Sequence, residues 1–256
     1  MQLPWRQALS EFLGTALLNA VGLSIVIFDF GARSPMLEWA PSAPWRRLIT
    51  GFLFGTVGAS IAISPVGKVS GAHINPAVTV AFWARGKMRL SDSALYIAAQ
   101  LAGGLAGATP LILWGAMGRS VEFAATAPGA AYTAAEALAG EFATTFVMIF
   151  LLFFFIGHRR LRAWTPLLFP FLYGMMVLLE APISGTSTNP ARSFGPAAIS
   201  GVWTAWWVYW AGPLAGALVA VAAHRFTGLR RFEVEVAKIY HFEHDPHGFF
   251  RRRREA

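Results

Sequence analysis

Two copies of the tripeptide Asn-Pro-Ala, at residues 75–77 and 189–191, provide the polar side chains best suited to contact a small molecule. Asparagine is a favoured N-terminal cap of a helix and proline a favoured first helical residue, so a helix is expected to begin at each copy. The side-chain oxygens of Asn75 and Asn189 can cap backbone N–H groups, while their amide N–H groups can donate to a passing oxygen atom. One copy usually marks only a helix start, whereas two copies in similar surroundings indicate a paired site.

One arginine, Arg192, follows the second asparagine by three residues, so both side chains lie on one face of the expected helix. The matching residue after Asn75 is Val78, which makes the paired site asymmetric. A charged residue within an apolar membrane segment indicates a functional role by default. Arg192 is therefore expected to repel cations and to hydrogen-bond the molecule that passes.

The composition indicates the elements that position these residues. Of 256 residues, 55% are hydrophobic and only 13% are charged, which is typical of a polytopic membrane protein. A membrane-spanning helix needs roughly 20 apolar residues. Six stretches approach or exceed that length, and the fifth reaches it only together with its flanking residues. These predicted spans cover residues 12–28, 48–66, 94–117, 134–156, 164–179 and 203–223.

The two halves of the chain repeat each other in sequence. Glu-Phe opens the first and fourth predicted spans at Glu11 and Glu141, and Ser-Gly precedes each Asn-Pro-Ala at residues 70–71 and 184–185. Residues 103–108 and 212–217 form similar small-residue runs in the third and sixth spans, which favour close helix packing. Because each half has three spans, the halves must enter the membrane from opposite sides, as an inverted repeat.

The segments that follow each asparagine are too short to cross a membrane and too apolar to be solvated loops. Half-helices are expected over residues 75–84 and 189–200, each about 15 Å long, with their N-terminal ends meeting at the midplane. Irregular backbone at that depth must pack against protein or line a water-filled cavity. The expected pore-lining carbonyls are those of Gly71, Ala72, His73, Gly185, Thr186 and Ser187.

Charge distribution predicts orientation and domain boundaries. Lys and Arg are concentrated in one set of loops and in the tails. By the positive-inside rule this places both termini in the cytoplasm, although Arg46 and Arg47 then fall on the outer side, against the rule. The net charge of +8 is thereby attributed to topology rather than to nucleic-acid binding. The first repeat is assigned to residues 1–120, the second to 121–228, and a basic cytoplasmic tail to 229–256.

Other ionisable residues have a structural and a chemical interpretation. Matching positions in both halves favour Glu11 and Glu141 as acceptors for loop N–H groups, with proton or ion carriers as the alternative. His73 is expected to pack within its loop rather than bind a metal, and His241, His244 and His247 to belong to a solvated tail. The chain has no cysteine, and no nucleophile, cofactor-binding loop or catalytic carboxylate pair stands out, so no enzyme activity, cofactor or metal is expected.

From about residue 11 to 226 the chain resembles the aquaporin, or major intrinsic protein, family. The resemblance rests on residues 70–79 and 189–197, which contain the two Asn-Pro-Ala copies. It implies an all-α integral membrane protein with six transmembrane helices and two re-entrant half-helices, assembled as a homotetramer in the cell membrane. Ser193 and the pair Tyr209 and Trp210 resemble the residues that water channels of the family carry at these positions. Glycerol channels typically carry Asp at the position of Ser193.

The resemblance also implies a selectivity filter around Arg192. Val177 occupies the fifth-helix position, where water channels usually have histidine, and Thr186 fits the loop position. The second-helix member is Gly55 by an ungapped count from Asn75, or Phe54 if Pro65 is an inserted residue. One residue turns a helix by about 100°, so this choice decides between an open and an aromatic filter.

The leading hypothesis is a passive channel that conducts water down osmotic gradients and excludes protons and cations. A wider filter would instead suit glycerol, ammonia or metalloid hydroxides, and Val177, together with Gly55 if it is the second-helix member, favours that alternative. An ion-coupled secondary transporter that uses Glu11 or Glu141, and a protein that transports nothing, are the remaining hypotheses. The expected partners are water, small neutral solutes, the lipid bilayer and further copies of the chain.

Overall fold

The computed structural model describes residues 4–226, 234 and 236–240, and these form helices and turns without a strand. Five helical stretches are long and apolar enough to cross a membrane: Trp5–Phe30, Ala43–Ile63, Leu90–Arg119, Ala134–Gly157 and Arg162–Ser184. The sixth long helix, α12 (Val208–Phe226), has 19 residues, and its last turn carries His224 and Arg225, which lower its mean hydropathy. The predicted all-α membrane fold is confirmed.

Helix bounds differ from the predicted spans mainly where polar residues extend a helix. The first helix consists of α1 (Trp5–Leu17), a π-helical turn η1 (Leu18–Gly22) and α2 (Leu23–Phe30). The fifth, α10 (Thr165–Ser184), is longer than its predicted 164–179, because it continues through Glu180 and Pro182. The sixth begins later than predicted. The other long helices are α4 (Ala43–Ile63), α7 (Leu90–Ala108) and α9 (Ala134–Gly157).

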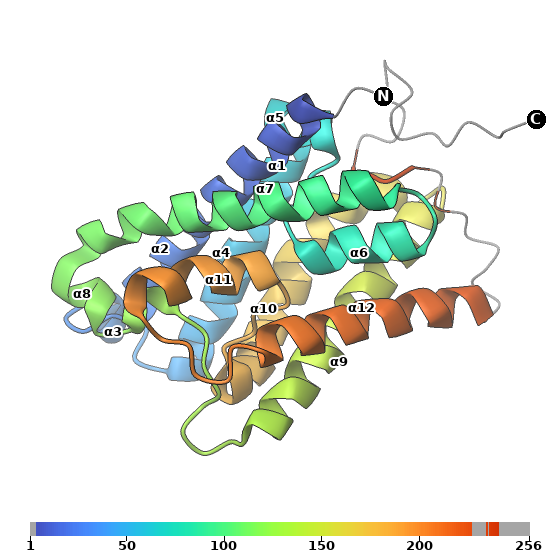
Figure 1. The fold of residues 1–256 in the computed structure, drawn as a ribbon. Helices are drawn as coiled ribbons and strands as arrows, with labels where there is room; N and C mark the ends of the chain where they lie inside the picture. Colours follow the sequence, from blue (N-terminus) through green and yellow to red (C-terminus); the bar gives the residue numbers. More distant parts are fainter. Residues whose placement is uncertain (1–3, 227–233, 235, 241–256) are drawn as a thin grey trace, which may run out of the picture.

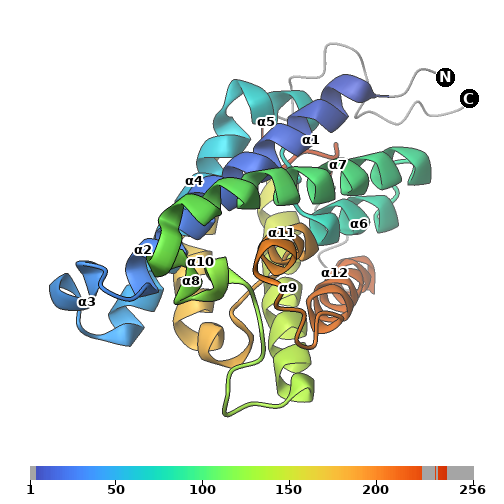
Figure 2. The same ribbon diagram turned by 60° about the vertical axis from the view of Figure 1, so that its left-hand side comes forward.

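The two half-helices are α6 (Pro76–Ala84) and α11 (Pro190–Ser200). Each packs against the last long helix of the other half: α6 lies along α12, and α11 lies along α7 (Figure 1). Within the halves, α1 packs on α7 and α9 packs on α12, and α4 crosses α10 between the halves (Figure 2). This exchange of half-helices is the packing that an inverted repeat produces.

Small residues allow the helices of each half to approach closely. A Cβ atom added to Gly103 would lie 2.2 Å from the carbonyl oxygen of Phe12, and one added to Gly216 would lie 2.4 Å from that of Phe142. Real Cβ atoms do not approach backbone so closely, so these glycines set the α1–α7 and α9–α12 distances. Gly51 does the same at the α4–α10 crossing, 2.2 Å from the Tyr173 carbonyl oxygen.

Short helices connect the long ones. Helix α3 (Met36–Trp39) and the turns η2 (Thr109–Trp114), α8 (Gly115–Arg119) and η3 (Glu122–Ala124) lie at one end of the bundle, and η4 (Arg162–Trp164) precedes α10. Between α4 and the first half-helix the chain forms α5 (Pro65–Ser70), where the Ser64 hydroxyl accepts a hydrogen bond from the Gly67 N–H group at 3.2 Å. The predicted second span ended at residue 66, and no helix was expected between it and Asn75.

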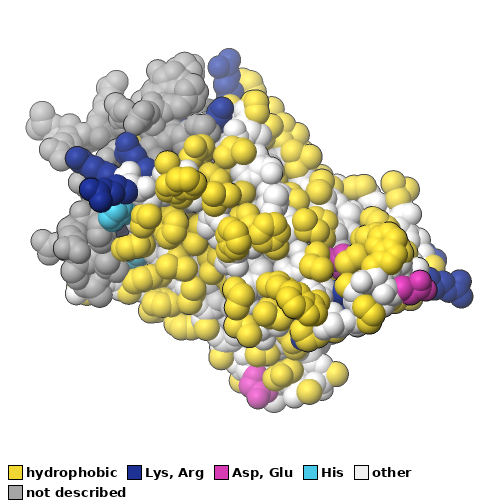
Figure 3. Space-filling model, turned by 180° about the vertical axis from the view of Figure 1, so that it is seen from behind, with side chains coloured by type: hydrophobic (Ala, Val, Ile, Leu, Met, Phe, Trp, Pro, Cys, Tyr) yellow, Lys and Arg dark blue, Asp and Glu magenta, His cyan; other side chains and the backbone are white. Residues whose placement is uncertain are grey.

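The surface is apolar around the middle of the bundle. Figure 3 shows a broad hydrophobic face with Lys and Arg side chains at its margins. Exposed tryptophans include Trp5, Trp39, Trp45, Trp164 and Trp206. Tryptophan is enriched where proteins meet the membrane–water interface, so this surface suits an integral membrane protein.

Candidate functional site

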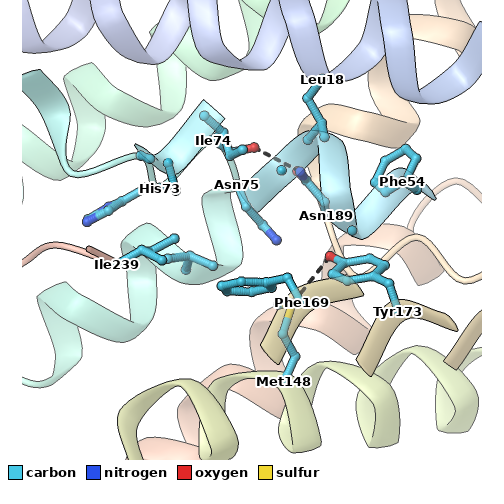
Figure 4. Close-up of a pocket in the computed structure, with 15 residues that line it drawn as sticks. Leu18, Phe54, His73, Ile74, Asn75, Met148, Phe169, Tyr173, Asn189 and Ile239 are labelled. Atoms are coloured by element: carbon cyan, nitrogen blue, oxygen red, sulfur yellow. Dashed lines mark hydrogen bonds between the residues drawn. The ribbon is translucent and has the colours of Figure 1, made fainter. Parts of the chain in front are cut away.

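The N-terminal ends of the two half-helices meet and are joined by their asparagines. The Asn75 side-chain oxygen accepts from the Ala77 N–H group at 2.8 Å, and that of Asn189 accepts from Ala191 at 3.0 Å. Each amide nitrogen then donates across the junction. Asn75 donates to the Thr188 carbonyl oxygen at 2.8 Å, and Asn189 donates to that of Ile74 at 2.9 Å (Figure 4). One N–H of each amide is used in this way, which leaves a second N–H on each asparagine.

The loops before the asparagines have the same backbone conformation. Positive φ angles occur four, three and one residues before each asparagine: Gly71 (89°), Ala72 (57°) and Ile74 (43°), and Gly185 (88°), Thr186 (52°) and Thr188 (51°). A left-handed conformation costs a residue with a side chain roughly 1–2 kcal/mol. Four such residues are held in this conformation, so other contacts must stabilise the loops.

Two fully buried carboxylates provide those contacts. Glu11 accepts from the backbone N–H groups of His73 at 2.9 Å and Ile74 at 2.6 Å. Glu141 accepts from the N–H groups of Ser187 and Thr188, both at 2.7 Å. The two glutamates therefore occupy equivalent places in the two halves, and each binds the loop of its own half.

The carbonyls expected to line a pore fall into two groups. Ala72 and His73 lie on the cavity beside Asn75 and Asn189, which we call the inner cavity. Gly185 and Thr186 lie on the cavity that contains Arg192, which we call the outer cavity. The Gly71 carbonyl oxygen instead accepts from the Ile239 N–H group at 3.0 Å, and the Ser187 carbonyl oxygen accepts from the Thr188 hydroxyl at 2.7 Å. Neither of these two residues lines either cavity.

The outer cavity has a volume of about 270 Å³ and contains Arg192. Val177, Thr186 and Phe54 line it with Arg192, whose guanidinium donates to the Ala124 carbonyl oxygen at 3.0 Å. Arg192 is only 5% exposed. The structure thus brings together four of the five residues that the sequence associated with a filter.

Gly55 is the fifth, and it lies elsewhere. A Cβ atom at this position would be 2.4 Å from the Phe169 carbonyl oxygen, so Gly55 allows α4 to pack against α10. It contacts the inner cavity but not the cavity of Arg192. Of the two alternatives, Phe54 is the one that lines the cavity of Arg192, because Gly55 faces α10.

The inner cavity is small, about 40 Å³, which leaves room for only a few water molecules. Asn75 and Asn189 line it together with apolar side chains that include Leu18, Phe169 and Ile239 (Figure 4). A polar junction thus lies in a mostly apolar channel.

His73 packs within the site. Its Nδ1 atom lies 3.1 Å from the Thr79 hydroxyl, its Nε2 atom lies 3.1 Å from the Ala237 carbonyl oxygen, and its ring stacks on Phe82. Within the described part of the chain, no group of three or more His, Cys, Asp or Glu residues could hold a metal ion. His241, His244 and His247 lie outside the described residues.

Sequence reasoning missed several residues of the site. Tyr173 lines both cavities, and its hydroxyl lies 2.8 Å from that of Thr188. Its position one helical turn before Val177 was the available signal. Arg47 lines the outer cavity, and Arg46 donates to the Ala40 carbonyl oxygen at 2.7 Å. These contacts give Arg46 and Arg47 a structural reason to occur in a loop where the positive-inside rule does not predict arginine.

A family model described as the major intrinsic protein family matches residues 1–224. The chain belongs to this family. It is 36% identical over 222 residues to the lens fiber major intrinsic protein of Gallus gallus, covering 84% of this chain and 79% of that protein. It is 39% identical over 212 residues to the probable aquaporin TIP4-1 of Oryza sativa subsp. japonica, covering 82% and 78% of the two chains.

The fold is also found in a solved structure. The aquaglyceroporin from Plasmodium falciparum superimposes with a TM-score of 0.73 over 90% of this chain and 98% of that one, at 19% identity. The major intrinsic protein family consists of channels rather than enzymes. The protein is therefore an integral membrane channel for water or small solutes.

Proposed function

We propose that this protein conducts water passively down osmotic gradients and excludes protons and cations. The junction of the two half-helices carries the proposal. Asn75 and Asn189 each have a second amide N–H and lie on the same small cavity. A water molecule that accepts from both amides has its own hydrogens turned away from them, which interrupts a hydrogen-bonded chain of water and hence proton transfer.

Electrostatics supports the exclusion of cations. The N-terminal ends of α6 and α11 each carry about half an elementary positive charge and both point at the junction. Arg192 adds a full charge to the wall of the outer cavity. A cation that enters from that side meets a fixed positive charge and then two positive helix ends, whereas a neutral molecule meets hydrogen-bond donors.

Osmotic shrinkage of proteoliposomes tests the water function. Stopped-flow light scattering should give a water permeability well above that of empty liposomes, with a low activation energy. Proton flux measured with an internal pH dye should stay at the level of empty liposomes. Water permeability equal to that of empty liposomes, for protein that is folded and inserted, would refute the proposal.

A second candidate function is the passage of small neutral solutes such as glycerol, ammonia or metalloid hydroxides. The volume of the outer cavity, about 270 Å³, and the apolar Val177 on its wall favour this candidate. Glycerol and urea uptake, measured on the same proteoliposomes as water, separates the two functions. A glycerol flux at the level of empty liposomes would eliminate glycerol as a permeant.

An ion-coupled transporter would use Glu11 or Glu141 as a carrier. Both carboxylates are fully buried and already accept hydrogen bonds from two backbone N–H groups, which favours a structural role. Flux that increases linearly with the solute gradient and is unaffected by collapse of proton or sodium gradients is expected of a channel. Saturable flux that stops without an ion gradient would support the transporter.

We also propose a homotetramer in the cell membrane with both termini in the cytoplasm. The six crossings predicted from the sequence bring both ends to one side, and the distribution of Lys and Arg selects the cytoplasm. Native mass spectrometry in detergent tests the assembly, with a single tetrameric species expected. Protease access to terminal tags in inside-out vesicles tests the orientation.

A further inference from the structure

We propose that Tyr173, with Phe54, sets the size limit for solutes in this channel, one helical turn inward of Val177. This proposal rests on the proposed passive conduction. Among the described residues, Phe54 and Tyr173 line both cavities, so their rings lie where the outer cavity of about 270 Å³ meets the inner one of about 40 Å³. At the outer level Val177 contributes only a short apolar side chain, so that level is wide.

The two rings are close together and held in place. Their centroids are 5.7 Å apart with an interplanar angle of 35° (Figure 4). Phe54 packs on Gly22 of the π-helical turn, where an added Cβ would lie 2.6 Å from the ring. The Tyr173 hydroxyl lies 2.8 Å from the Thr188 hydroxyl and donates to the Met148 sulfur at 3.4 Å. Neither ring can move aside without breaking one of these contacts.

The position of Tyr173 also gives it a polar role. Its hydroxyl is bonded to Thr188, whose carbonyl oxygen accepts from Asn75. A solute therefore meets this hydroxyl immediately before the asparagine junction. Water can exchange hydrogen bonds at that point, whereas a solute with a carbon chain must also pass beside the two packed rings.

Three variants test the size limit through the ratio of glycerol to water permeability. Tyr173→Val should raise this ratio at least about tenfold, which corresponds to a barrier lower by ~1.4 kcal/mol. Tyr173→Phe retains the ring and loses only the hydroxyl, so the ratio should rise by less than in Tyr173→Val. Phe171→Val removes an exposed ring of the same helix that lines neither cavity and should leave the ratio unchanged, which makes it the matched control.

The outcomes separate this proposal from the proposed function. Wild-type protein without water flux refutes the function itself. A wild type that conducts water, with a Tyr173→Val variant whose ratio is unchanged, refutes the size limit alone. If Tyr173→Val does not yield folded protein, Phe54→Val tests the same limit from the other ring, and an unchanged ratio there is equally contradictory.

A second inference comes from an independent observation at the inner end of the channel. We infer that residues 236–240 partly block the inner cavity, so that the channel conducts water more slowly with this segment in place than without it. Val236, Ala237, Lys238 and Ile239 are each at most 5% exposed. The Ile239 side chain lines the inner cavity with His73 and Asn75, as Figure 4 shows.

This segment is bonded directly to the first loop. The Ile239 N–H group donates to the Gly71 carbonyl oxygen at 3.0 Å, and the Ala237 carbonyl oxygen lies 3.1 Å from His73 Nε2. A Cβ atom on Gly71 would lie 2.7 Å from the Ala237 oxygen, so glycine is needed for this approach. The second loop makes no such contact with the described tail residues, so the block lies on one side only.

Truncations test the block. Ending the chain after residue 233 should raise water permeability per folded protein at least about threefold, whereas ending it after residue 240 should leave the rate unchanged, because that variant retains the segment. Ile239→Ser, which places a small polar side chain in the cavity, should also raise the rate. Equal rates for wild type, Ile239→Ser and any truncation that folds would refute the block.

Discussion

Replacement of Glu141 by glutamine is expected to disrupt the second loop because the carboxylate satisfies three donors at once. Glu141 accepts from the Ser184 hydroxyl at 2.6 Å and from the Ser187 and Thr188 N–H groups, both at 2.7 Å. Glutamine has one oxygen and one amide NH₂ group, so one donor loses its acceptor and faces another donor. A buried unsatisfied donor costs about 1–3 kcal/mol, and the remaining bonds lose the contribution of the charge.

The summed loss is about 2–5 kcal/mol. At roughly 2–4 °C per kcal/mol for a chain of this size, the unfolding midpoint in detergent should fall by about 4–20 °C. Tryptophan fluorescence on heating measures the midpoint, and Glu38→Gln is the matched control, since Glu38 is exposed on α3. A Glu141→Gln midpoint within 1 °C of this control, together with unchanged water permeability, would contradict the assigned role of the carboxylate.

Further predictions concern the junction, the outer cavity and helix packing. Asn189→Asp removes an amide donor and adds negative charge, so proton flux measured with a pH dye should rise while the protein stays folded. Arg192→Val removes one of the two arginine charges that line the outer cavity, with Arg47 the other, so the urea-to-water permeability ratio should rise; an unchanged ratio counts against a filter there. Gly103→Ala should lower the free energy of unfolding by about 1–3 kcal/mol, seen as a lower unfolding midpoint, because its Cβ would lie 2.2 Å from the Phe12 oxygen, whereas Gly58→Ala enters open space and should not.

Local signals were sufficient for most of the fold. An asparagine followed by proline caps a helix through contacts within four residues, and both half-helices begin at the predicted position. The apolar stretches and the repeated small residues likewise depend on short segments, so the long helices and their close pairs could be predicted. Helix ends were less predictable: α10 continues through Glu180, which is buried in the bundle although it is ionisable.

The pathway depended on how helices rotate relative to one another. Whether Phe54 or Gly55 faces Arg192 is a difference of about 100° around α4. That rotation is fixed by the packing of α4 on α10, where Gly51 and Gly55 approach the α10 backbone, and a count along the sequence does not include this packing. Tyr173 was missed for a related reason, since its importance comes from Phe54 on another helix rather than from its own neighbours.

The sequence by itself determined the membrane class, the inverted repeat and the two opposed half-helices, because hydrophobic length and capping chemistry act over a few residues. Tertiary structure alone decided which side chains meet at the narrow part of the channel and placed Ile239 beside Asn75. Those contacts join residues more than a hundred positions apart, and they depend on helix rotation and on where a tail segment packs, neither of which a local pattern specifies.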